Sequence, residues 1–237
     1  MPVIIEVLEP TAAAAIKSAF NYFEAVDKKF STYKPDSEVS LLNAGKISAQ
    51  QASPEFAEVL SLAELTKQQT NGYFDIYRNG QCDPSGLVKG WAIRNAAEIL
   101  SNSGFNNFYV DAGGDIQASG HNSEGKKWTV GIRNPFNREQ IVKVLQIEDR
   151  GVATSGTYIR GEHIYNPKTG VPANEIASLT VIGPDVYEAD RFATAAFAMG
   201  KSGIAFLERL PGFEAYMIGH DGTATLTSGL DQYFQLI

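Results

Sequence analysis

The stretch NFYVDAGGDIQAS, residues 107–119, marks the place where the pattern of the chain changes. Before Gly104 the apolar residues recur at helical spacing, and after it they gather in short runs of the kind that form strands. The later runs are KWTVGI, IVKVLQI, SLTVI, FEAYMIG and TATLT. We therefore expect a helix-rich first part and a strand-rich second part.

The first part is predicted to hold one strand and three helices. Residues 3–8 read as a strand, and apolar residues at three- and four-residue steps over residues 16–30 predict an amphipathic helix. A Ser-Pro pair at residues 53–54 suits the start of a helix that an Asn-Gly pair at 71–72 would end. The third helix is expected from about residue 87 to residue 100.

Two more helices, residues 188–199 and 203–210, are predicted among the later strands. Because the helices are grouped and do not alternate strictly with the strands, the fold class predicted is a layered α+β architecture. The chain contains no linker, repeat or low-complexity segment, so we expect residues 1–237 to form a single domain.

Composition excludes several classes of function. The 237 residues are 43% hydrophobic and 20% charged, which is typical of a protein with a substantial buried core. The formal net charge of -7, without a run of Lys or Arg, gives no basic surface for nucleic acid. A single cysteine, Cys82, excludes an internal disulfide and a cysteine-rich metal site, and we expect it to be a buried small residue.

The amino terminus, MPVIIEVLEP, lacks a basic start followed by a long apolar run. It does not resemble a signal peptide, and no apolar stretch of 18 residues follows. We expect a cytoplasmic protein as the sequence stands, or a periplasmic or membrane-anchored one if an amino-terminal signal has been removed.

The segment DPSGLVKGWA, residues 83–92, runs from a turn directly into a helix. Free N–H groups and the helix dipole favour an anion at such a point, and Lys89 adds a positive charge. One interpretation is phosphate binding. The other is a well-capped helix with a solvated lysine.

The segment DAGGDI, residues 111–116, also allows two interpretations. An acidic residue that closes a strand, followed by Ala-Gly-Gly, would let the backbone approach a ligand that a Cβ atom would obstruct. The same residues could form a tight turn between two strands.

The segment EADRFATAAFAMG, residues 188–200, is predicted to be a helix with Asp185 as its N-cap. Asp190 and Thr194 are four residues apart, so they lie on one face of that helix. A carboxylate beside a hydroxyl suits Mg²⁺ better than zinc, because both are hard oxygen donors. A helix surface pair without a ligand is the alternative.

The segment GVATSGTYIRGEHIYNPKTG, residues 151–170, places His163 between a predicted Thr-Ser-Gly turn and an Asn-Pro-Lys-Thr-Gly turn. A neutral imidazole is the usual general base for a hydroxyl, and turns on both sides would hold it at the rim of a site. A structural histidine is the alternative interpretation.

Taken together, these segments resemble the ApbE family of FAD:protein FMN transferases, which are Mg²⁺-dependent flavin transferases. The motifs that carry the resemblance follow one another in a fixed order between about residue 33 and residue 200. They are FSTYKPDSEVSLLN, TNGYFDI, DPSGLVKGWA, VDAGGDI, VGIRNP, ATSGTY, HIYNPKTG and ADRFATAAFAMG.

The resemblance implies a layered, two-lobe, T-fold-like architecture with antiparallel-rich sheets and a flavin cleft between the lobes. It also implies that FAD is cleaved, that FMN passes through its phosphate to a Thr or Ser hydroxyl of a target flavoprotein, and that AMP is released. By resemblance, the Mg²⁺ ligands are Asp190, Thr194 and the carbonyl of Gly86, and the base that takes the acceptor's proton is His163. The residues implied to contact FAD are Met1, Tyr33, Tyr73, Lys89, Asp111, Gly113, Gly114 and Thr157.

The sequence departs from the family pattern at a few positions. Pro2 follows Met1 where the family has glycine, Asn166 replaces a common aspartate, and Arg191 stands where a small residue is usual. The loop before His163 is also short. These departures affect the expected recognition of the acceptor protein more than the binding of flavin.

Two other functions remain compatible with the sequence. A flavin-binding protein without transferase activity would keep the flavin and metal residues and lack a productive acceptor site. A Mg²⁺-dependent FAD pyrophosphatase would keep all of them and transfer the phosphate to water.

Overall fold

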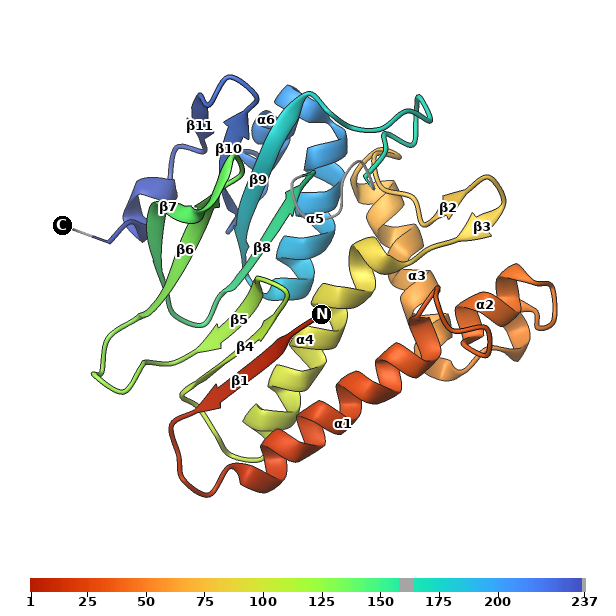
Figure 1. Ribbon diagram of the computed structural model, residues 1–237, viewed down its shortest axis with the longest axis horizontal. Coiled ribbons are helices and arrows are strands. Elements are labelled where there is room, and N and C mark those ends of the chain that lie inside the picture. Colours follow the sequence, from red (N-terminus) through yellow and green to blue (C-terminus); the bar gives the residue numbers. More distant parts are fainter. Residues whose placement is uncertain (158–163, 236–237) are drawn as a thin grey trace.

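A computed structural model describes residues 1–157 and 164–235, and over these residues its centre is a seven-stranded sheet (Figure 1). Every neighbouring pair of strands is antiparallel. In order across the sheet, the strands are β1 (Val3–Val7), β4 (Phe108–Ala112), β5 (Asp115–Ser119), β8 (Gly151–Gly156), β9 (Ile176–Gly183), β10 (Glu214–Gly219) and β11 (Ala224–Leu226).

Helices cover one face of the sheet and a β-hairpin covers the other (Figure 1). The helices on the first face are α1 (Ala13–Phe30), α4 (Ser85–Asn102) and α5 (Val186–Ala198), with α6 (Gly203–Leu207) beside α5. The hairpin on the second face is formed by β6 (Trp128–Asn134) and β7 (Asn137–Ile147). The result is a three-layered α+β fold with antiparallel sheets, as the sequence predicts.

A second lobe lies beyond α4, away from the sheet (Figure 1). It contains α2 (Glu38–Asn43), α3 (Pro54–Gln69) and the short strands β2 (Tyr77–Arg78) and β3 (Gln81–Cys82). Three single-turn 3₁₀ segments complete the described elements: Ala49–Gln51, Gly200–Ser202 and Leu230–Tyr233. On one side α4 packs Ile93 against the sheet, and on the other it packs Trp91 against the second lobe, so the helix belongs to both cores.

The start of α5 lies very close to the sheet and to α4 because two glycines face it. A Cβ atom on Gly151 would lie 2.0 Å from the backbone nitrogen of Val186, and one on Gly90 would lie 2.7 Å from the Cβ atom of Asp190. Gln117 accepts the Val186 N–H at 2.9 Å, and Asp185 caps the helix by accepting the Glu188 N–H at 2.8 Å. These contacts fix the position of the helix that carries Asp190.

Arg191, which follows Asp190, is 4% exposed and joins α5 to α3. Its guanidinium donates hydrogen bonds to Glu188 at 2.5 Å, to Gln69 at 2.6 Å and to Thr66 at 3.2 Å. Because all three partners are polar and close, the buried charge is well compensated. Arginine at this position therefore ties the two lobes together.

Most sequence-predicted elements are confirmed, with shifted ends, and Ser53 caps α3 as expected. The Thr-Ser-Gly turn predicted at residues 154–156 is wrong, because these residues form the end of strand β8. They pair with Thr180, Leu179 and Ser178 of β9. This tertiary pairing outweighs the turn preference of Ser and Gly. Helix α2 and the β2–β3 hairpin are absent from the sequence prediction, since both are too short to show a period.

We predict that Gly151→Ala lowers the free energy of unfolding by about 3 kcal/mol or more, because the new methyl group meets the backbone of α5. Gly131→Ala is the matched control, since a Cβ atom there meets only the side chain of Ile141, which is 44% exposed. Urea unfolding of both variants measures the difference. Equal stability of the two variants would contradict the close packing of α5.

We also predict that Cys82 is unreactive in the folded protein. The side chain is 2% exposed, and burial raises the pKa of its thiol to about 12, so very little thiolate forms at pH 8. A chromogenic disulfide reagent at pH 8 should label the protein only after denaturant is added. Rapid stoichiometric labelling of the native protein would show that the thiol is accessible.

Candidate active site

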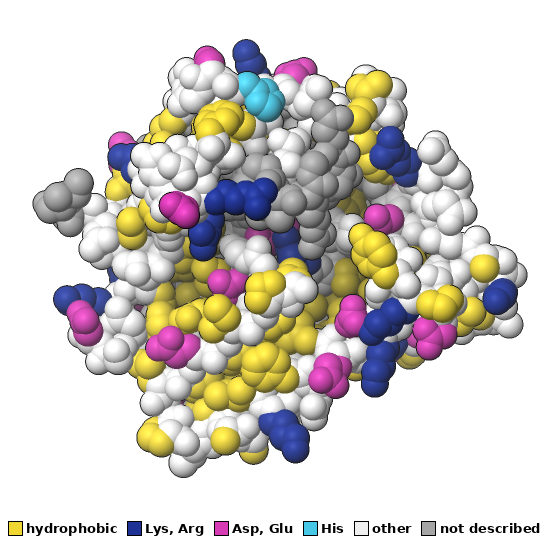
Figure 2. Space-filling model, viewed as in Figure 1, with side chains coloured by type: hydrophobic (Ala, Val, Ile, Leu, Met, Phe, Trp, Pro, Cys, Tyr) yellow, Lys and Arg dark blue, Asp and Glu magenta, His cyan; other side chains and the backbone are white. Residues whose placement is uncertain are grey.

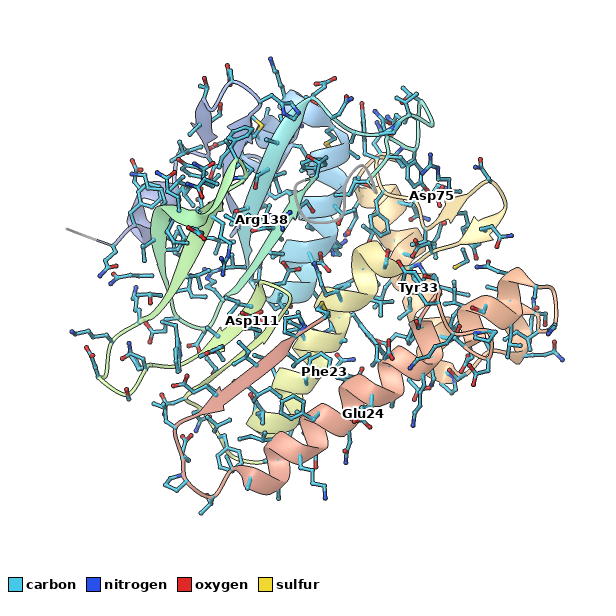
Figure 3. All side chains as sticks on the ribbon, viewed as in Figure 1. Phe23, Glu24, Tyr33, Asp75, Asp111 and Arg138 are labelled. Carbon is cyan, nitrogen blue, oxygen red and sulfur yellow. The ribbon has the colours of Figure 1, made fainter. Side chains whose placement is uncertain are left out.

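A cavity of about 720 Å³ opens between the two lobes, in the middle of the face shown in Figure 2. This volume is within the usual range for small-molecule sites. Its wall is assembled from segments far apart in the sequence: the amino terminus, residues 73–89, the β4–β5 turn, the end of β8, residues 164–167 and one face of α5. Figure 3 shows Asp111 and Asp75 on its two sides.

The β4–β5 turn confirms the tight-turn interpretation of the DAGGDI segment. Gly113 and Gly114 have φ angles of +68° and +96°, which suit glycine in a tight hairpin turn, and Asp111 accepts the Gly114 N–H at 2.8 Å. The turn also lines the cavity, where a Cβ atom on Gly113 would lie 2.7 Å from the sulfur of Met1. Burial raises the pKa of Asp111, and the Gly114 N–H opposes this shift.

The start of α4 reaches the floor of the cavity. Asp83 accepts the Ser85 N–H at 3.0 Å, which stabilises the turn into the helix. The Thr194 hydroxyl donates to the carbonyl oxygen of Gly86 at 3.3 Å, so α4 and α5 meet at these two residues. A Cβ atom on Gly86 would lie 3.1 Å from Thr194, so a larger residue would crowd this contact.

Lys89 is not the solvated lysine of the alternative interpretation. Its ammonium lies 2.5 Å from a carboxylate oxygen of Asp115 and 3.6 Å from one of Asp190, and both carboxyl side chains are almost fully buried. Two buried carboxyl groups therefore share this ammonium, which leaves an excess of acidic groups at the floor of the cavity.

Asp190 is buried and fixed by the backbone of α4. Its carboxylate is 5% exposed and accepts the Gly90 N–H at 2.8 Å. Burial raises its pKa to about 7, Lys89 opposes the shift and Asp115 adds to it. A carboxyl group in this position stays ionised more readily when another cation lies against it.

The donors present fit a hard cation such as Mg²⁺. Asp190, Thr194 and the Gly86 carbonyl all line the cavity and supply oxygen, the element that Mg²⁺ prefers, and the excess of acidic groups favours a cation. Over residues 1–157 and 164–235, no group of three or more His, Cys, Asp or Glu side chains could hold a metal ion. A zinc site of the usual nitrogen and sulfur type is therefore not found in this part of the chain.

The structure brings most of the predicted residues together. The lining of the cavity includes Met1, Tyr73, Gly86, Lys89, Asp111, Gly113, Gly114, Asp190 and Thr194. Tyr33 and Thr157 are not in the lining, and Tyr33, in the loop after α1 (Figure 3), is 95% exposed. His163 lies outside the described residues.

Several residues of the site are not singled out by the sequence. Asp115 is the most important, because it holds Lys89 and accepts the Thr154 N–H at 3.1 Å. The sequence offers one signal for Asp115: a charged residue at the first position of a strand needs a partner if the strand is buried. Residues that line the cavity without a predicted role include Asp75, Arg78, Arg133 and Tyr165.

Asn166 has a clear structural role. Its side chain accepts the Lys168 N–H at 2.9 Å, and its carbonyl accepts the Gly170 N–H at 2.8 Å. Asn and Asp both make such turns, so asparagine at this position keeps the turn without a charge.

The sequence matches the family model described as the ApbE family over residues 1–79 and 78–217. The two matched regions are continuous and include the whole cavity wall. The chain belongs to the ApbE family.

Curated relatives of this ApbE chain carry the name FAD:protein FMN transferase. The protein from Escherichia coli (strain K12) is 32% identical over 155 residues, 61% of this chain and 44% of the relative. The protein from Haemophilus influenzae is 34% identical over 130 residues, 50% of this chain and 38% of the relative. The chain thus matches less than half the length of these relatives.

Solved structures extend the likeness of fold to nearly the whole chain. The flavin transferase ApbE from Vibrio cholerae aligns with a TM-score of 0.84 at 23% identity and covers 98% of this chain and 95% of that one. The ApbE protein from Thermotoga maritima aligns with a TM-score of 0.86 at 21% identity and covers 99% and 95%. These alignments confirm the predicted mixed helix and sheet fold.

No helix in the described part of the ApbE chain is both long enough and apolar enough to cross a membrane, which agrees with the sequence prediction.

We predict that millimolar Mg²⁺ raises the melting temperature of the parent protein and that Asp190→Asn abolishes this response. The substitution removes the charged ligand, while its side-chain oxygen still accepts the Gly90 N–H. Without Mg²⁺ the variant should be at least as stable as the parent, because one buried carboxylate is lost. Asp83→Asn, at another carboxylate of the cavity wall, is the control and should keep the response. A full Mg²⁺ response in Asp190→Asn would exclude this residue as a ligand.

Proposed function

We propose that the protein is a Mg²⁺-dependent FAD:protein FMN transferase. The observation that carries the proposal is the cavity itself, whose lining includes the predicted metal donors and most of the predicted FAD contacts. The names of the curated relatives support the same activity. The continuous family match supports a single transferase domain over residues 1–237.

In the proposed reaction, the hydroxyl oxygen of a Thr or Ser on the acceptor protein attacks the phosphorus atom on the FMN side of FAD. A new P–O bond forms, the bond to the bridging pyrophosphate oxygen breaks, and AMP leaves with that oxygen. The hydroxyl proton passes to His163, the proposed general base. The products are FMN joined to the acceptor through a phosphoester, and AMP.

Asp190, Thr194 and the Gly86 carbonyl would hold Mg²⁺, which supplies neutralisation of the pyrophosphate charge when it is bound. Lys89 would contact the phosphates from the same floor, because it lines the cavity. Its ammonium is already held in place by the two buried carboxyl groups. Asp115 would keep that ammonium in place when a metal ion takes over Asp190.

The remaining predicted residues would bind the nucleotide. Met1 and the Gly113–Gly114 turn form one side of the cavity and Tyr73 another, so FAD would lie between them. Tyr33 and Thr157 lie outside the lining, and they would contact FAD only where the ligand extends beyond the cavity. We expect a stacking contact with flavin at Tyr33 only under that condition.

One assay tests the proposed activity. The purified protein is incubated with FAD and Mg²⁺, with and without candidate acceptor flavoproteins, and the products are separated. Covalent flavin fluorescence on an acceptor, with release of AMP, supports the transferase. Free FMN and AMP would indicate a pyrophosphatase, and unchanged bound FAD would indicate a flavin-binding protein.

We predict that His163→Ala lowers the rate of FMN transfer by about 10²- to 10⁴-fold, the usual contribution of a positioned base. FAD affinity and the Mg²⁺ response should stay close to those of the parent. In the parent, the transfer rate should rise with pH as the imidazole loses its proton.

The control for this variant is His121→Ala, which removes a surface histidine paired with Glu148 at 3.0 Å. It should leave transfer unchanged. A His163→Ala protein that melts earlier, binds FAD weakly and still transfers FMN at the normal rate would identify a structural histidine.

A further inference from the structure

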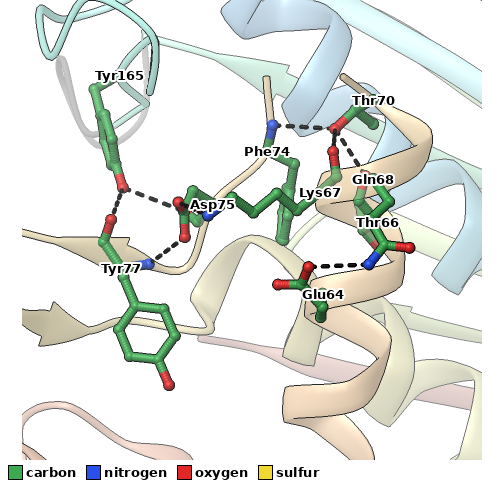
Figure 4. A network of polar contacts seen from close by, with 9 residues as sticks. All are labelled: Glu64, Thr66, Lys67, Gln68, Thr70, Phe74, Asp75, Tyr77 and Tyr165. Atoms are coloured by element: carbon green, nitrogen blue, oxygen red, sulfur yellow. Dashed lines mark hydrogen bonds and ion pairs between the residues drawn. The ribbon is translucent and has the colours of Figure 1, made fainter. Parts of the chain in front are cut away.

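Two segments of the cavity wall, about ninety residues apart in the sequence, are joined by one side chain (Figure 4). The Tyr165 hydroxyl lies 3.1 Å from the carbonyl oxygen of Asp75 and 3.1 Å from that of Tyr77, so its proton is shared between two acceptors. Tyr165 and Asp75 both line the cavity. The contact therefore closes the wall between the second lobe and the segment after residue 163.

The same two segments exchange cation–aromatic contacts. The guanidinium carbon of Arg78 lies 4.5 Å from the centre of the Tyr165 ring, and the ammonium of Lys168 lies 4.2 Å from the centre of the Tyr73 ring. Each segment supplies one ring and one cation, so neither contact can move without the other. We name these four residues, Tyr73, Arg78, Tyr165 and Lys168, the clasp.

The first half of the clasp stands on a rigid base at the end of α3 (Figure 4). Thr70 donates to the Thr66 carbonyl at 2.7 Å and accepts the Phe74 N–H at 3.2 Å. The Asp75 carboxylate is held by Lys67 at 2.7 Å and by the Tyr77 N–H at 2.9 Å. The two carbonyls that meet Tyr165 are therefore fixed relative to the helix.

The second half is a small hairpin. Ile164 accepts the Ala173 N–H at 2.9 Å and Val171 accepts the Asn166 N–H at 2.8 Å, so the strands on either side of the Asn-Pro-Lys-Thr-Gly turn are paired. Burial raises the pKa of the Tyr165 hydroxyl, which keeps its proton available for donation. Ile164 and Ala173 anchor the base of the hairpin in the main core. The rest of the hairpin has little core of its own, so its position depends on the contacts of Tyr165 and Lys168.

We propose that Tyr165 and Lys168 are positioning residues, which fix the 164–173 hairpin against the second lobe and so set the shape of the cavity for its ligand. The inference rests on the proposed function only in taking that ligand to be FAD. Ile164 and Pro167, on the same hairpin, line the cavity and would move with it. A displaced wall would weaken FAD binding and misalign the FAD that still binds.

The test uses Tyr165→Phe, which keeps the ring under Arg78 and removes the hydroxyl, and Lys168→Met, which keeps an apolar stem and removes the charge. Tyr22→Phe is the matched control. Its hydroxyl accepts a hydrogen bond of 2.8 Å from Asn95, so it also loses one partly buried bond, and Tyr22 is not part of the cavity wall. For each protein we would measure the melting temperature, the Kd for FAD, and kcat and KM for FMN transfer.

For Tyr165→Phe we expect the Kd for FAD to rise about threefold to tenfold, and kcat at saturating FAD to fall about tenfold. Lys168→Met should also raise the Kd for FAD and lower kcat. The double variant should lose less than the product of the two single effects, because both residues hold one hairpin. Tyr22→Phe should lower the melting temperature as much as Tyr165→Phe does, with Kd and kcat unchanged.

The clasp would be overturned by a Tyr165→Phe protein whose Kd and kcat stay within twofold of the parent, or by independent effects in the double variant. The proposed function fails in a different way, when the parent binds FAD and transfers FMN to no acceptor. In that case the role of the clasp is tested by the Kd for FAD alone, compared between the variants and the parent.

Discussion

The structure depends on the contact between α4 and α5, where Asp190 is buried. Gly90 has no side chain, so the two helices approach closely enough for its N–H to reach the Asp190 carboxylate at 2.8 Å. On the sheet side, Gly151 also has no side chain, so Val186 at the start of α5 can lie against the backbone of β8. These glycines place a charged side chain inside the protein and aim it at the cavity. Without them the carboxylate would have no fixed position in the interior.

That burial is costly, and the neighbouring charges offset only part of the cost. Lys89 lies against Asp115 and Asp190 together, so the floor of the cavity keeps two acidic groups and one basic group away from water. A protein selected for stability alone would gain by an apolar residue at one of these positions. The excess of acidic groups supports the proposed cationic partner, and the oxygen donors around it are of the kind that Mg²⁺ prefers. This reasoning uses the donors and the charges and does not depend on the family.

The sequence predicts the floor of the site better than its rim. Asp190 and Thr194 share a helix face, and the i, i+4 rule needs no tertiary information, so their placement follows from local geometry. For the DAGGDI segment the sequence leaves a ligand-facing loop and a tight turn equally open, and the structure shows the turn. Asp115 is missed because its importance comes from Lys89, which is 26 residues away in the sequence. The end of β8 is misread as a turn because its strand form depends on pairing with β9, and a single sequence does not display pairing. Tyr165 is missed for the same reason, since its partners are carbonyls, which every residue has.

Buried charges and close backbone contacts hold the floor of the cavity, whereas surface contacts hold much of its rim. This difference bears on function. At the floor, buried charges and close contacts at glycines leave the side chains almost no freedom to move. This suits a metal site, whose ligands must keep fixed distances to the ion. At the rim, the base of the hairpin after residue 163 is anchored in the core by Ile164 and Ala173, and the rest is held by exposed cations over aromatic rings and by one shared hydroxyl proton. Such contacts are individually weak and can break and form again at little cost. In the proposed reaction the site admits a large nucleotide and then meets a hydroxyl on another protein, which needs a rigid floor and a rim that can adjust. The division between buried charges and surface contacts gives this fold both properties.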